Sequence, residues 1–418
     1  MERQLPFAAA GAALAIACIA APFGALFFLG LLAPVDGYIS SVVVYRDLLA
    51  VDLIGLALIV GEWRRGWRFP ARPATVAALV ALFALCVFNV LSLGPANWTY
   101  AWDNSARLAF WCVVVAAIVS TRGHTHVRPA CAGLVLGMAA RFGYEAYLFV
   151  TDPGFMLHPS YQFGGFTSNP NTMAGFGACV LTIAAAFTLR PSSRHVRILA
   201  AITTMCLLLG IVLSFSKGSW LAAATACAVW LFHGLRTGFI TRRAVVRTTV
   251  VVALLVLLVP CVRRMPGLML QRWMSHGSAV SNQERLRYIE TATSLIRERP
   301  LFGVGLERFG EEYLKTRRLL RGPDDPHNGY LMVAVELGIP ALGCLLLFQA
   351  LVTVSAFVSV RDAPTAVAPL YAALSAGVAA LLVFQMFSAE PLTARTALVV
   401  MALSLTVPSR ADHEEVDG

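Results

Sequence analysis

Charged residues are scarce in this chain. They make up 13% of the 418 residues, whereas 58% of the residues are hydrophobic. Such a chain has too few polar side chains to cover the surface of a water-soluble globule. A soluble enzyme or binding domain is therefore excluded, and we predict a protein that crosses a membrane many times.

The chain also lacks the spacing patterns of metal-binding or redox cysteines. Its nine cysteines include no CxxC pair and no Cys/His spacing for zinc, and almost all lie within apolar runs. We interpret them as small hydrophobic residues. The net charge of +10 does not indicate nucleic-acid binding, because the basic residues sit mostly in short loops between apolar runs.

Apolar runs long enough to cross a bilayer of about 30 Å recur along the chain. They lie at about 7–33, 42–61, 74–93, 105–121, 129–150, 171–189, 197–213, 217–234, 245–261, 329–360, 364–387 and 391–407. We therefore predict an all-α fold with about twelve transmembrane helices, of which the first is too long to be a cleaved signal. Residues 1–261 would hold nine of them, 262–326 one large outer loop with helices, 327–408 the last three, and 409–418 a cytoplasmic tail.

Arginines collect in alternate loops. Those after spans two, four, six and eight carry Arg64, Arg65, Arg68, Arg72, Arg122, Arg128, Arg190, Arg194, Arg197, Arg236, Arg242, Arg243 and Arg247. The short loops after spans one, three and five carry no Lys or Arg. Since basic loops stay in the cytoplasm, we expect both termini there. The 262–326 loop would then face outward, into the periplasm of a Gram-negative bacterium.

The 262–326 segment is the one part that looks soluble. It holds twelve basic and eight acidic residues. Long loops cross the membrane regardless of charge, so this surplus indicates either a solvated amphipathic helix pair or an anion bound on that side. Residues 281–298 predict a helix, which Pro300, Gly303 and Gly305 end in a turn. The predicted apolar stripe of that helix is Leu286, Ile289, Thr293 and Ile296.

Charged residues within the predicted spans gather toward the outer side. They are Arg46, Asp47, Arg107, Arg141, Glu145, Glu390 and Arg395. Charges are costly inside a membrane, so they indicate either a functional site or ion pairs between helices. Arg141 and Glu145 are four residues apart and would share a helix face.

His327 is the candidate general base. The preceding Asp325-Pro326 predicts a helix start, with Asp325 as N-cap and proline in the first turn. The positive end of the helix dipole would keep the imidazole neutral and able to accept a proton. An ordinary loop histidine is the alternative. Glu336 would lie about 13 Å deeper and is not expected to orient His327.

Two outer turns are candidate binding elements. Lys217, one of two lysines with Lys315, follows Ser216 and precedes Gly218. Its ammonium could bind a phosphate or merely reach the lipid headgroups. The turn with Asn169 and Asn171 could equally be a helix cap. Adjacent Asp324 and Asp325 are a weak magnesium signal, which capping explains equally well.

The order of these motifs resembles the O-antigen ligase and O-antigen polymerase superfamily of bacterial membrane glycosyltransferases. The turn ending in Asn169-Pro170-Asn171 is similar to the family's G-x-x-x-NPN element, and Ser214–Gly218 to its S-x-S-R-G element. Pro300–Gly305 resembles the PLFGVG turn, with Arg285 and Tyr288 before it. His327-Asn328 and Glu336-Leu-Gly338 resemble the H-N-x-x-L and E-x-G-I signature. Lys217 replaces an arginine and cannot make its bidentate fork.

The resemblance implies a GT-C-like transferase that moves a glycan from undecaprenyl pyrophosphate to a sugar hydroxyl at the outer face of the inner membrane, without metal or cofactor. In the ligase branch the acceptor is lipid A-core oligosaccharide. His327 would be the base, with Arg285 also catalytic. The pyrophosphate would be bound by Lys217, Arg285, Arg287 and Arg141. Substrate-binding or structural residues would be Arg46, Asn169, Asn171, Ser216, Asn328 and Glu336.

Three other functions remain open at this point. The polymerase branch would use a second undecaprenyl-linked unit as acceptor, and a protein O-oligosaccharyltransferase would use a protein. A transporter of lipid-linked glycans or anions would also place arginines in the membrane. Transporters tend to show inverted repeats, and this sequence has no evident internal repeat.

Overall fold

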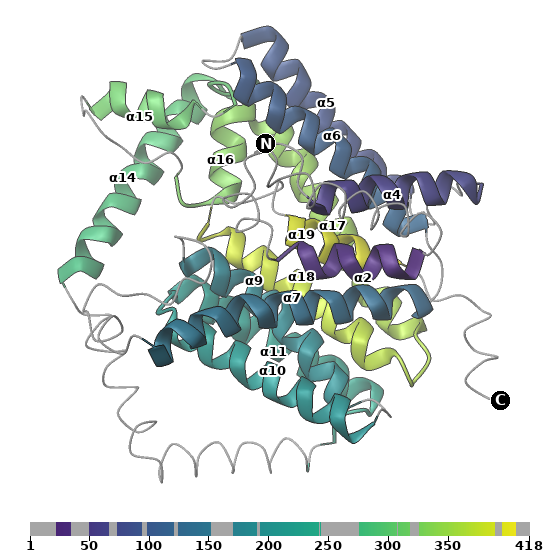
Figure 1. The fold of residues 1–418 in the computed structure, drawn as a ribbon. Helices are drawn as coiled ribbons and strands as arrows, with labels where there is room; N and C mark the ends of the chain where they lie inside the picture. Colours follow the sequence, from purple (N-terminus) through teal and green to yellow (C-terminus); the bar gives the residue numbers. More distant parts are fainter. Residues whose placement is uncertain are drawn as a thin grey trace, which may run out of the picture.

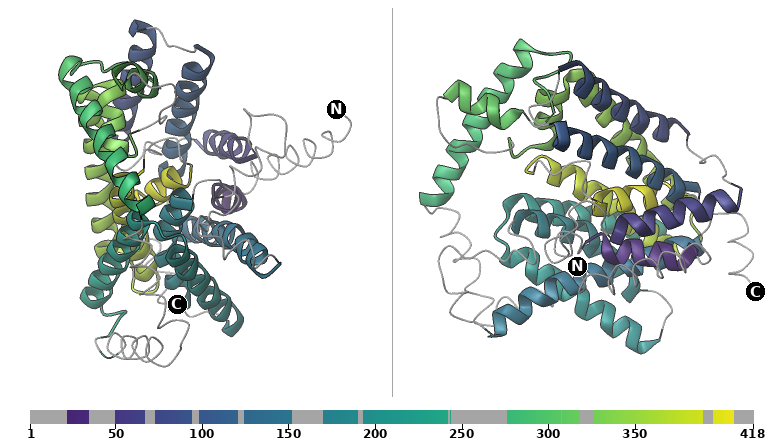
Figure 2. Two further views of the ribbon diagram at one scale, coloured as in Figure 1. Left: turned by 90° about the vertical axis from the view of Figure 1, so that its left-hand side faces the viewer. Right: turned by 45° about the horizontal axis from the view of Figure 1, so that its top comes forward.

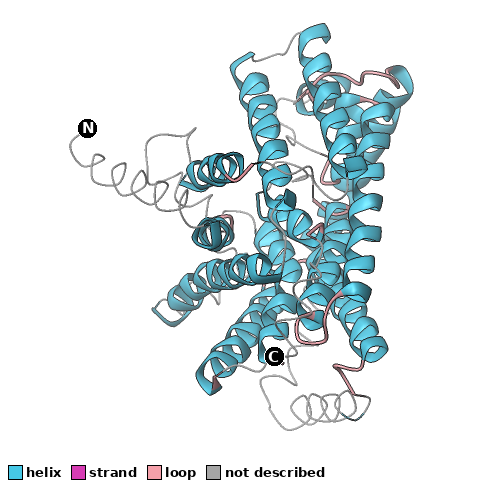
Figure 3. Cartoon of the chain, turned by 90° about the vertical axis from the view of Figure 1, so that its right-hand side faces the viewer, coloured by secondary structure: helices cyan, strands magenta, loops and turns pink. Residues whose placement is uncertain are grey.

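The computed structural model describes residues 22–34, 50–66, 73–93, 98–120, 124–151, 170–189, 193–241, 243, 276–306, 308–317, 326–388 and 395–406. Regular structure in these residues is entirely α-helical (Figure 3). The prediction of an all-α fold is therefore confirmed. The predicted span at 245–261 lies outside the described residues, whereas every other predicted span overlaps a helix.

Fourteen helices are described (Figure 1). Before the large loop they are α2 (Pro22–Leu32), α4 (Ala50–Arg64), α5 (Pro73–Leu93), α6 (Trp98–Ser120), α7 (His124–Thr151), α9 (Pro170–Thr188), α10 (Arg194–Leu213) and α11 (Lys217–Thr237). The loop holds α14 (His276–Glu298) and α15 (Phe309–Arg317). After it come α16 (Gly329–Leu337), α17 (Ile339–Asp362), α18 (Ala368–Gln385) and α19 (Arg395–Ser404).

Within the described residues, five helices are long and apolar enough to cross a membrane. They are Asn171–Thr188, Arg194–Leu213, Lys217–Thr237, Ile339–Asp362 and Ala368–Gln385. Shorter apolar helices occupy Ala74–Asn89 and Ala109–Ser120. The chain is thus a membrane protein, and the count of twelve spans stays a prediction.

Helix α18 forms the centre of the bundle. Nearly all of its side chains are buried, as expected for a helix that is apolar on every side and enclosed by other helices. It packs against α9, α11 and α17. The Phe384 ring lies 5.9 Å from the Phe176 ring of α9, and Thr182 Oγ1 donates a 3.1 Å hydrogen bond to the Ala373 carbonyl. The end of α18 is therefore held rigidly within the bundle.

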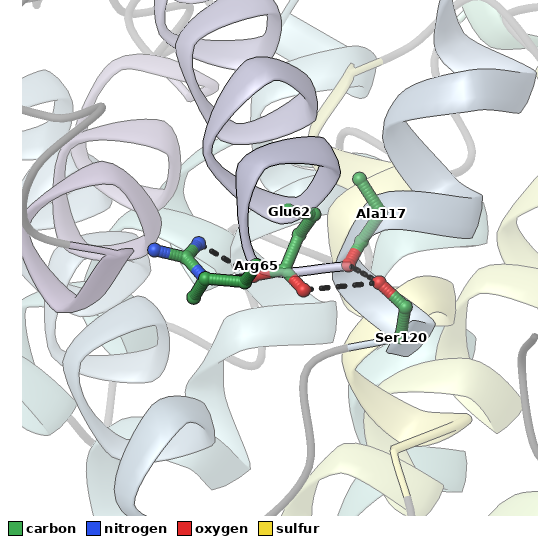
Figure 4. Close-up of polar contacts among 4 residues, drawn as sticks. All are labelled: Glu62, Arg65, Ala117 and Ser120. Atoms are coloured by element: carbon green, nitrogen blue, oxygen red, sulfur yellow. Dashed lines mark hydrogen bonds and ion pairs between the residues drawn. The ribbon is translucent and has the colours of Figure 1, made fainter. Parts of the chain in front are cut away.

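Helices α4 and α6 are joined by polar groups at their C-terminal ends (Figure 4). Arg65 Nη2 lies 2.6 Å from Glu62 Oε1, and Ser120 Oγ donates a 3.4 Å hydrogen bond to Glu62 Oε2. The same hydroxyl lies 2.8 Å from the Ala117 carbonyl. Arg65 belongs to the first arginine-rich loop, so this cluster ties two helix ends on the side that we predict to be cytoplasmic.

Helices α14 and α15 lie at one end of the bundle, on the left of Figure 1 and facing the viewer in the left panel of Figure 2. A separate hydrophobic cluster packs them on α16. Its buried members are Tyr288, Ala292, Leu295, Val304, Phe309, Tyr313 and Val335. The loop helices therefore have a small core of their own.

The apolar stripe predicted for residues 281–298 is wrong. Leu286 and Ile289 are 60% and 41% exposed, whereas Tyr288, Thr291 and Ala292 are buried. The prediction counted large aliphatic side chains. The real contact is made by one aromatic ring and small residues against the rings of α15, which selects a neighbouring face of the helix.

The single helix predicted over residues 329–360 is divided at Gly338. This residue has φ 90° and ψ 171°, which side chains with a Cβ rarely adopt. A Cβ there would also lie 2.2 Å from the Leu301 carbonyl oxygen. Pro340 lacks an N–H and favours a new helix start. The break makes room for the turn that follows α14.

Candidate functional site

The end of α18 is the point where two of the sequence motifs meet. Asn328 Nδ2 donates a 3.2 Å hydrogen bond to the carbonyl of Met386, directly after α18. A Cβ on Gly218 would lie 2.5 Å from Cβ of Phe387, so the α11 backbone touches the next residue of the same turn. His327-Asn328 and Lys217-Gly218 therefore flank the Met386–Phe387 turn.

Hydroxyl groups shape the turn that carries Lys217. Ser214 Oγ accepts a 3.2 Å hydrogen bond from the Ser216 N–H, and Ser216 caps α11 by accepting from the Ser219 N–H at 3.4 Å. Phe215 between the two serines has φ 53°. Lys217 is consequently the first residue of α11 and is half-buried. A cation at this end adds to the positive helix dipole, so the turn favours an anion.

The start of α9 lies against the same turn. Ser219 Oγ lies 3.1 Å from the Asn171 carbonyl, to which it donates, and 2.8 Å from Ser216 Oγ. Pro170 opens α9, as its missing N–H favours. The Asn169-Pro170-Asn171 motif thus contacts the Ser214–Gly218 turn through Asn171. Asn169 lies outside the described residues.

His327 directly precedes Asn328, the N-cap residue of α16, and is exposed. Its ring centroid is 5.8 Å from that of Tyr288 on α14, and its φ is 52°. The predicted N-cap at Asp325 is wrong, because Asn328 Oδ1 caps the helix by accepting from the N–H groups of Tyr330 and Leu331 at 3.0 and 3.1 Å. The histidine still lies at the N-terminal end of α16.

Arg285 lies on the same face of α14 as Tyr288, because the two residues are three apart on the helix. Arg285 is half-buried, whereas Arg287 is exposed on another face. Arg285 therefore shares the face of α14 that carries the Tyr288 ring, which contacts the His327 ring.

The Pro300–Gly305 turn fills the break between α16 and α17. The Val304 N–H donates to the Val335 carbonyl at 2.8 Å, and the Ile339 N–H donates to the Pro300 carbonyl at 2.8 Å. Gly303 has φ 66°, and a Cβ there would lie 2.3 Å from the Val335 oxygen. The turn thereby satisfies carbonyls at the end of α16 that have no partner within the helix.

Glu336 holds this turn in place. Its side chain is buried, and its Oε1 accepts a 3.3 Å hydrogen bond from the Phe309 N–H at the start of α15. Its carbonyl accepts from the Gly305 N–H at 3.1 Å. Glu336 therefore couples α16 to both the turn and α15.

Asn89 of α5 was not among the candidate residues. Its Nδ2 donates to the carbonyls of Phe302 and Glu336 at 2.5 and 3.1 Å, and its Oδ1 accepts from the Leu306 N–H at 3.2 Å. Asn89 is uncharged, so it does not stand out beside the charged residues of the predicted spans. A lone amide in the apolar 73–93 run is the signal that would have found it.

Arg141 is buried in α7, and its Nη1 donates a 2.7 Å hydrogen bond to the Pro34 carbonyl after α2. It therefore ties two helices together, and its role toward pyrophosphate stays a prediction. Other candidates have no described side chain. Arg46, Asp47, Asp324, Asp325 and Glu390 lie outside the described residues, and only the backbone is described for Arg107, Glu145 and Arg395.

These contacts define a helical membrane protein in which widely spaced polar motifs converge at one end of the bundle. Residues 202–346, roughly a third of the chain, match the family model described as O-antigen ligase. This stretch contains Lys217, Arg285, His327 and Glu336, so the predicted resemblance to the O-antigen ligase and polymerase superfamily is confirmed. No curated protein matches the chain.

Proposed function

We propose that this chain is an O-antigen ligase. It transfers O-antigen polysaccharide from undecaprenyl pyrophosphate to a sugar hydroxyl of lipid A-core oligosaccharide, at the periplasmic face of the inner membrane. The observation that carries the proposal is the convergence of the Lys217 and His327 motifs on the Met386–Phe387 turn. The Lys217 and His327 motifs both lie within residues 202–346, which match the O-antigen ligase family model.

The donor needs cations at its pyrophosphate. Lys217 and the N-terminus of α11 present positive potential together, and Arg285 supplies a guanidinium on the His327 side of α14. As the bond between the sugar and the pyrophosphate breaks, negative charge develops on the departing phosphate oxygen. Fixed positive groups stabilise that charge and lower the barrier. Arg287 and Arg141 are proposed as helpers.

The acceptor needs a base. In the proposed reaction, an acceptor hydroxyl oxygen attacks the anomeric carbon from the face opposite the pyrophosphate, so the configuration inverts. His327 takes the hydroxyl proton as the new bond forms. Its exposure allows a bulky acceptor glycan to reach it. Asn328, Glu336 and Asn89 hold the elements on which these groups sit.

The test is glycan transfer from purified undecaprenyl-pyrophosphate donor to lipid A-core in detergent. We expect His327→Ala to reduce transfer by about 10²- to 10⁴-fold, the usual contribution of a general base. His195→Ala is the matched control, because His195 is an exposed histidine at the start of α10. It should transfer at the native rate. Native transfer by His327→Ala would overturn the assignment of the base.

The same assay separates the alternatives. Longer undecaprenyl-linked chains without lipid A-core product would make the protein a polymerase. Accumulation of donor inside proteoliposomes without a new glycosidic bond would make it a transporter. We expect a chelator to leave transfer unchanged. Loss of activity that Mg²⁺ restores would contradict the metal-free mechanism and implicate Asp324 and Asp325.

A further inference from the structure

Five large apolar side chains form one exposed patch where the loop meets the bundle, and we call it the turn patch. Its members are Phe88 and Leu91 of α5, Leu301 and Phe302 of the turn, and Ile339 at the start of α17. They are 49%, 58%, 60%, 45% and 51% exposed. An apolar cluster this exposed is costly in water and marks a contact surface.

The turn patch is held together by specific contacts. The Phe302 ring lies 5.3 Å from the Phe88 ring, and the Phe302 carbonyl accepts from Asn89 Nδ2. The Ile339 N–H donates to the Pro300 carbonyl at 2.8 Å. Leu301 and Phe302 are therefore fixed against both helices rather than presented by a free loop.

The turn patch continues the outward faces of two apolar helices. Val80 on α5 is 48% exposed, and Leu346, Leu347 and Val354 on α17 are 49%, 54% and 62% exposed. In a helix that crosses a membrane, such side chains face lipid. Helices α5 and α17 pack side by side, so their outward faces meet below the turn.

The depth of the turn follows from its neighbours. Phe88 lies five residues before the end of α5, about 7.5 Å short of that helix end, and the Phe302 ring lies beside it at 5.3 Å. Ile339 is the first residue of the candidate span of α17. Both neighbours place the turn at the border of the apolar layer rather than above it.

We infer that Leu301 and Phe302 contact the acyl chains of the bilayer, so that this turn anchors the large loop in the membrane. The sequence alone predicts that all of 262–326 lies outside. Burying these two side chains in lipid removes their exposed apolar area from water, which favours the anchored position. The anchor holds the loop helices at a fixed depth. Resting on the proposed function, it also sets Arg285 at the level of a lipid-anchored pyrophosphate.

The experiment uses the native chain in liposomes of phosphatidylethanolamine and phosphatidylglycerol, without polyprenyl lipid. A carbene-generating group within the acyl chain is activated by light, and adducts are located by mass spectrometry. We expect adducts on Leu301 or Phe302 as well as on Leu346 and Leu347. Ser294 and Thr316, exposed residues of α14 and α15, should carry none.

Adducts on Leu346 and Leu347 without any on Leu301 or Phe302 would overturn the inference, whether water or a second copy covers the patch. A matched pair gives a second readout. Leu301→Asp should lower the adduct yield at Phe302 several-fold. Leu286→Asp should leave that yield unchanged, because Leu286 lies on α14 outside the turn patch. The two variants are matched because both leucines are 60% exposed. Equal yields in both variants would contradict the inference. The readout is labelling, so it is independent of transferase activity.

Discussion

Asn328 and Met386 are joined by a 3.2 Å hydrogen bond from the side-chain amide to the backbone carbonyl, while Oδ1 of the same side chain caps α16. One residue therefore sets both the start of the helix after His327 and the position of the turn that touches Gly218. Asn328 therefore connects the His327 side of the proposed site to the Lys217 side, through the Met386–Phe387 turn.

The substitution Asn328→Ser separates these two tasks. Serine is as good an N-cap as asparagine, but its short hydroxyl cannot reach Met386. We expect the unfolding temperature to stay near that of the native chain while the transfer rate falls about tenfold, equivalent to roughly 1.4 kcal/mol in the barrier. Asn328→Ala should reduce transfer as well, and should also cost about 1 kcal/mol of stability through the lost cap.

The control is Ser193→Ala. Ser193 caps α10 by accepting from the Val196 N–H and lies on the arginine-rich side of the bundle. It should lose stability without losing transfer. Native transfer by Asn328→Ser would show that the bond to Met386 does not position the site.

Glu336→Gln tests whether Glu336 is structural. The amide oxygen of glutamine can accept the Phe309 N–H in place of the carboxylate, whereas alanine leaves this buried donor without its acceptor. We therefore expect Glu336→Gln to keep most of the transfer activity. Glu336→Ala should cost about 1–3 kcal/mol and expose the 306–317 region to protease. Loss of transfer by Glu336→Gln with a native unfolding temperature would instead indicate a role in the chemistry.

Gly303→Ala tests the docking of the Pro300–Gly305 turn. The new Cβ would meet the Val335 oxygen at 2.3 Å, in addition to the strain of φ 66°. Gly238→Ala is the matched control, because Gly238 has φ 82° but no atom within 4 Å of a Cβ. The control should cost about 1–2 kcal/mol from strain alone. Gly303→Ala should lower the unfolding temperature further and reduce transfer, and equal effects in the two variants would contradict this close packing.

The sequence predicts those parts of the fold and site that depend on local pattern. Long apolar runs predict helices because unpaired backbone groups are too costly in lipid. The positions of Lys217 at the start of α11 and of His327 shortly before α16 follow from short motifs. Short motifs do not predict how exposed these two residues are, nor that both lie beside the Met386–Phe387 turn.

Other features depend on partners that are distant in the sequence. Asp325 and Asn328 are both good N-caps, and the bond from Asn328 to Met386 is a tertiary contact that no local rule contains. The break at Gly338 depends on Leu301, and the buried face of α14 depends on the rings of α15. Asn89 can form its hydrogen bonds to Phe302, Glu336 and Leu306 only when α5 lies beside the turn. Each error therefore arises where tertiary contact overrides local preference.

Lys217 offers the sharpest test of the proposed anion site, because there function and helix stability oppose each other. A cation at the first position of α11 is unfavourable toward the helix dipole, by about 0.3–1 kcal/mol. Lys217→Met should therefore melt at or above the native temperature, yet transfer at least tenfold more slowly, because the charge that meets the departing pyrophosphate is gone. Lys217→Arg keeps the charge and should stay within a few-fold of the native rate.

Lys315→Met is the control for Lys217→Met. Lys315, the other lysine, is 65% exposed and lies 2.9 Å from Glu312 on α15, so its loss should change neither property measurably. A fall in kcat with unchanged KM for Lys217→Met would mean that the ammonium acts mainly in the transition state, and a rise in KM alone would mean that it binds the donor. Native kinetics for Lys217→Met would leave the anion site without its principal cation and would contradict the proposal.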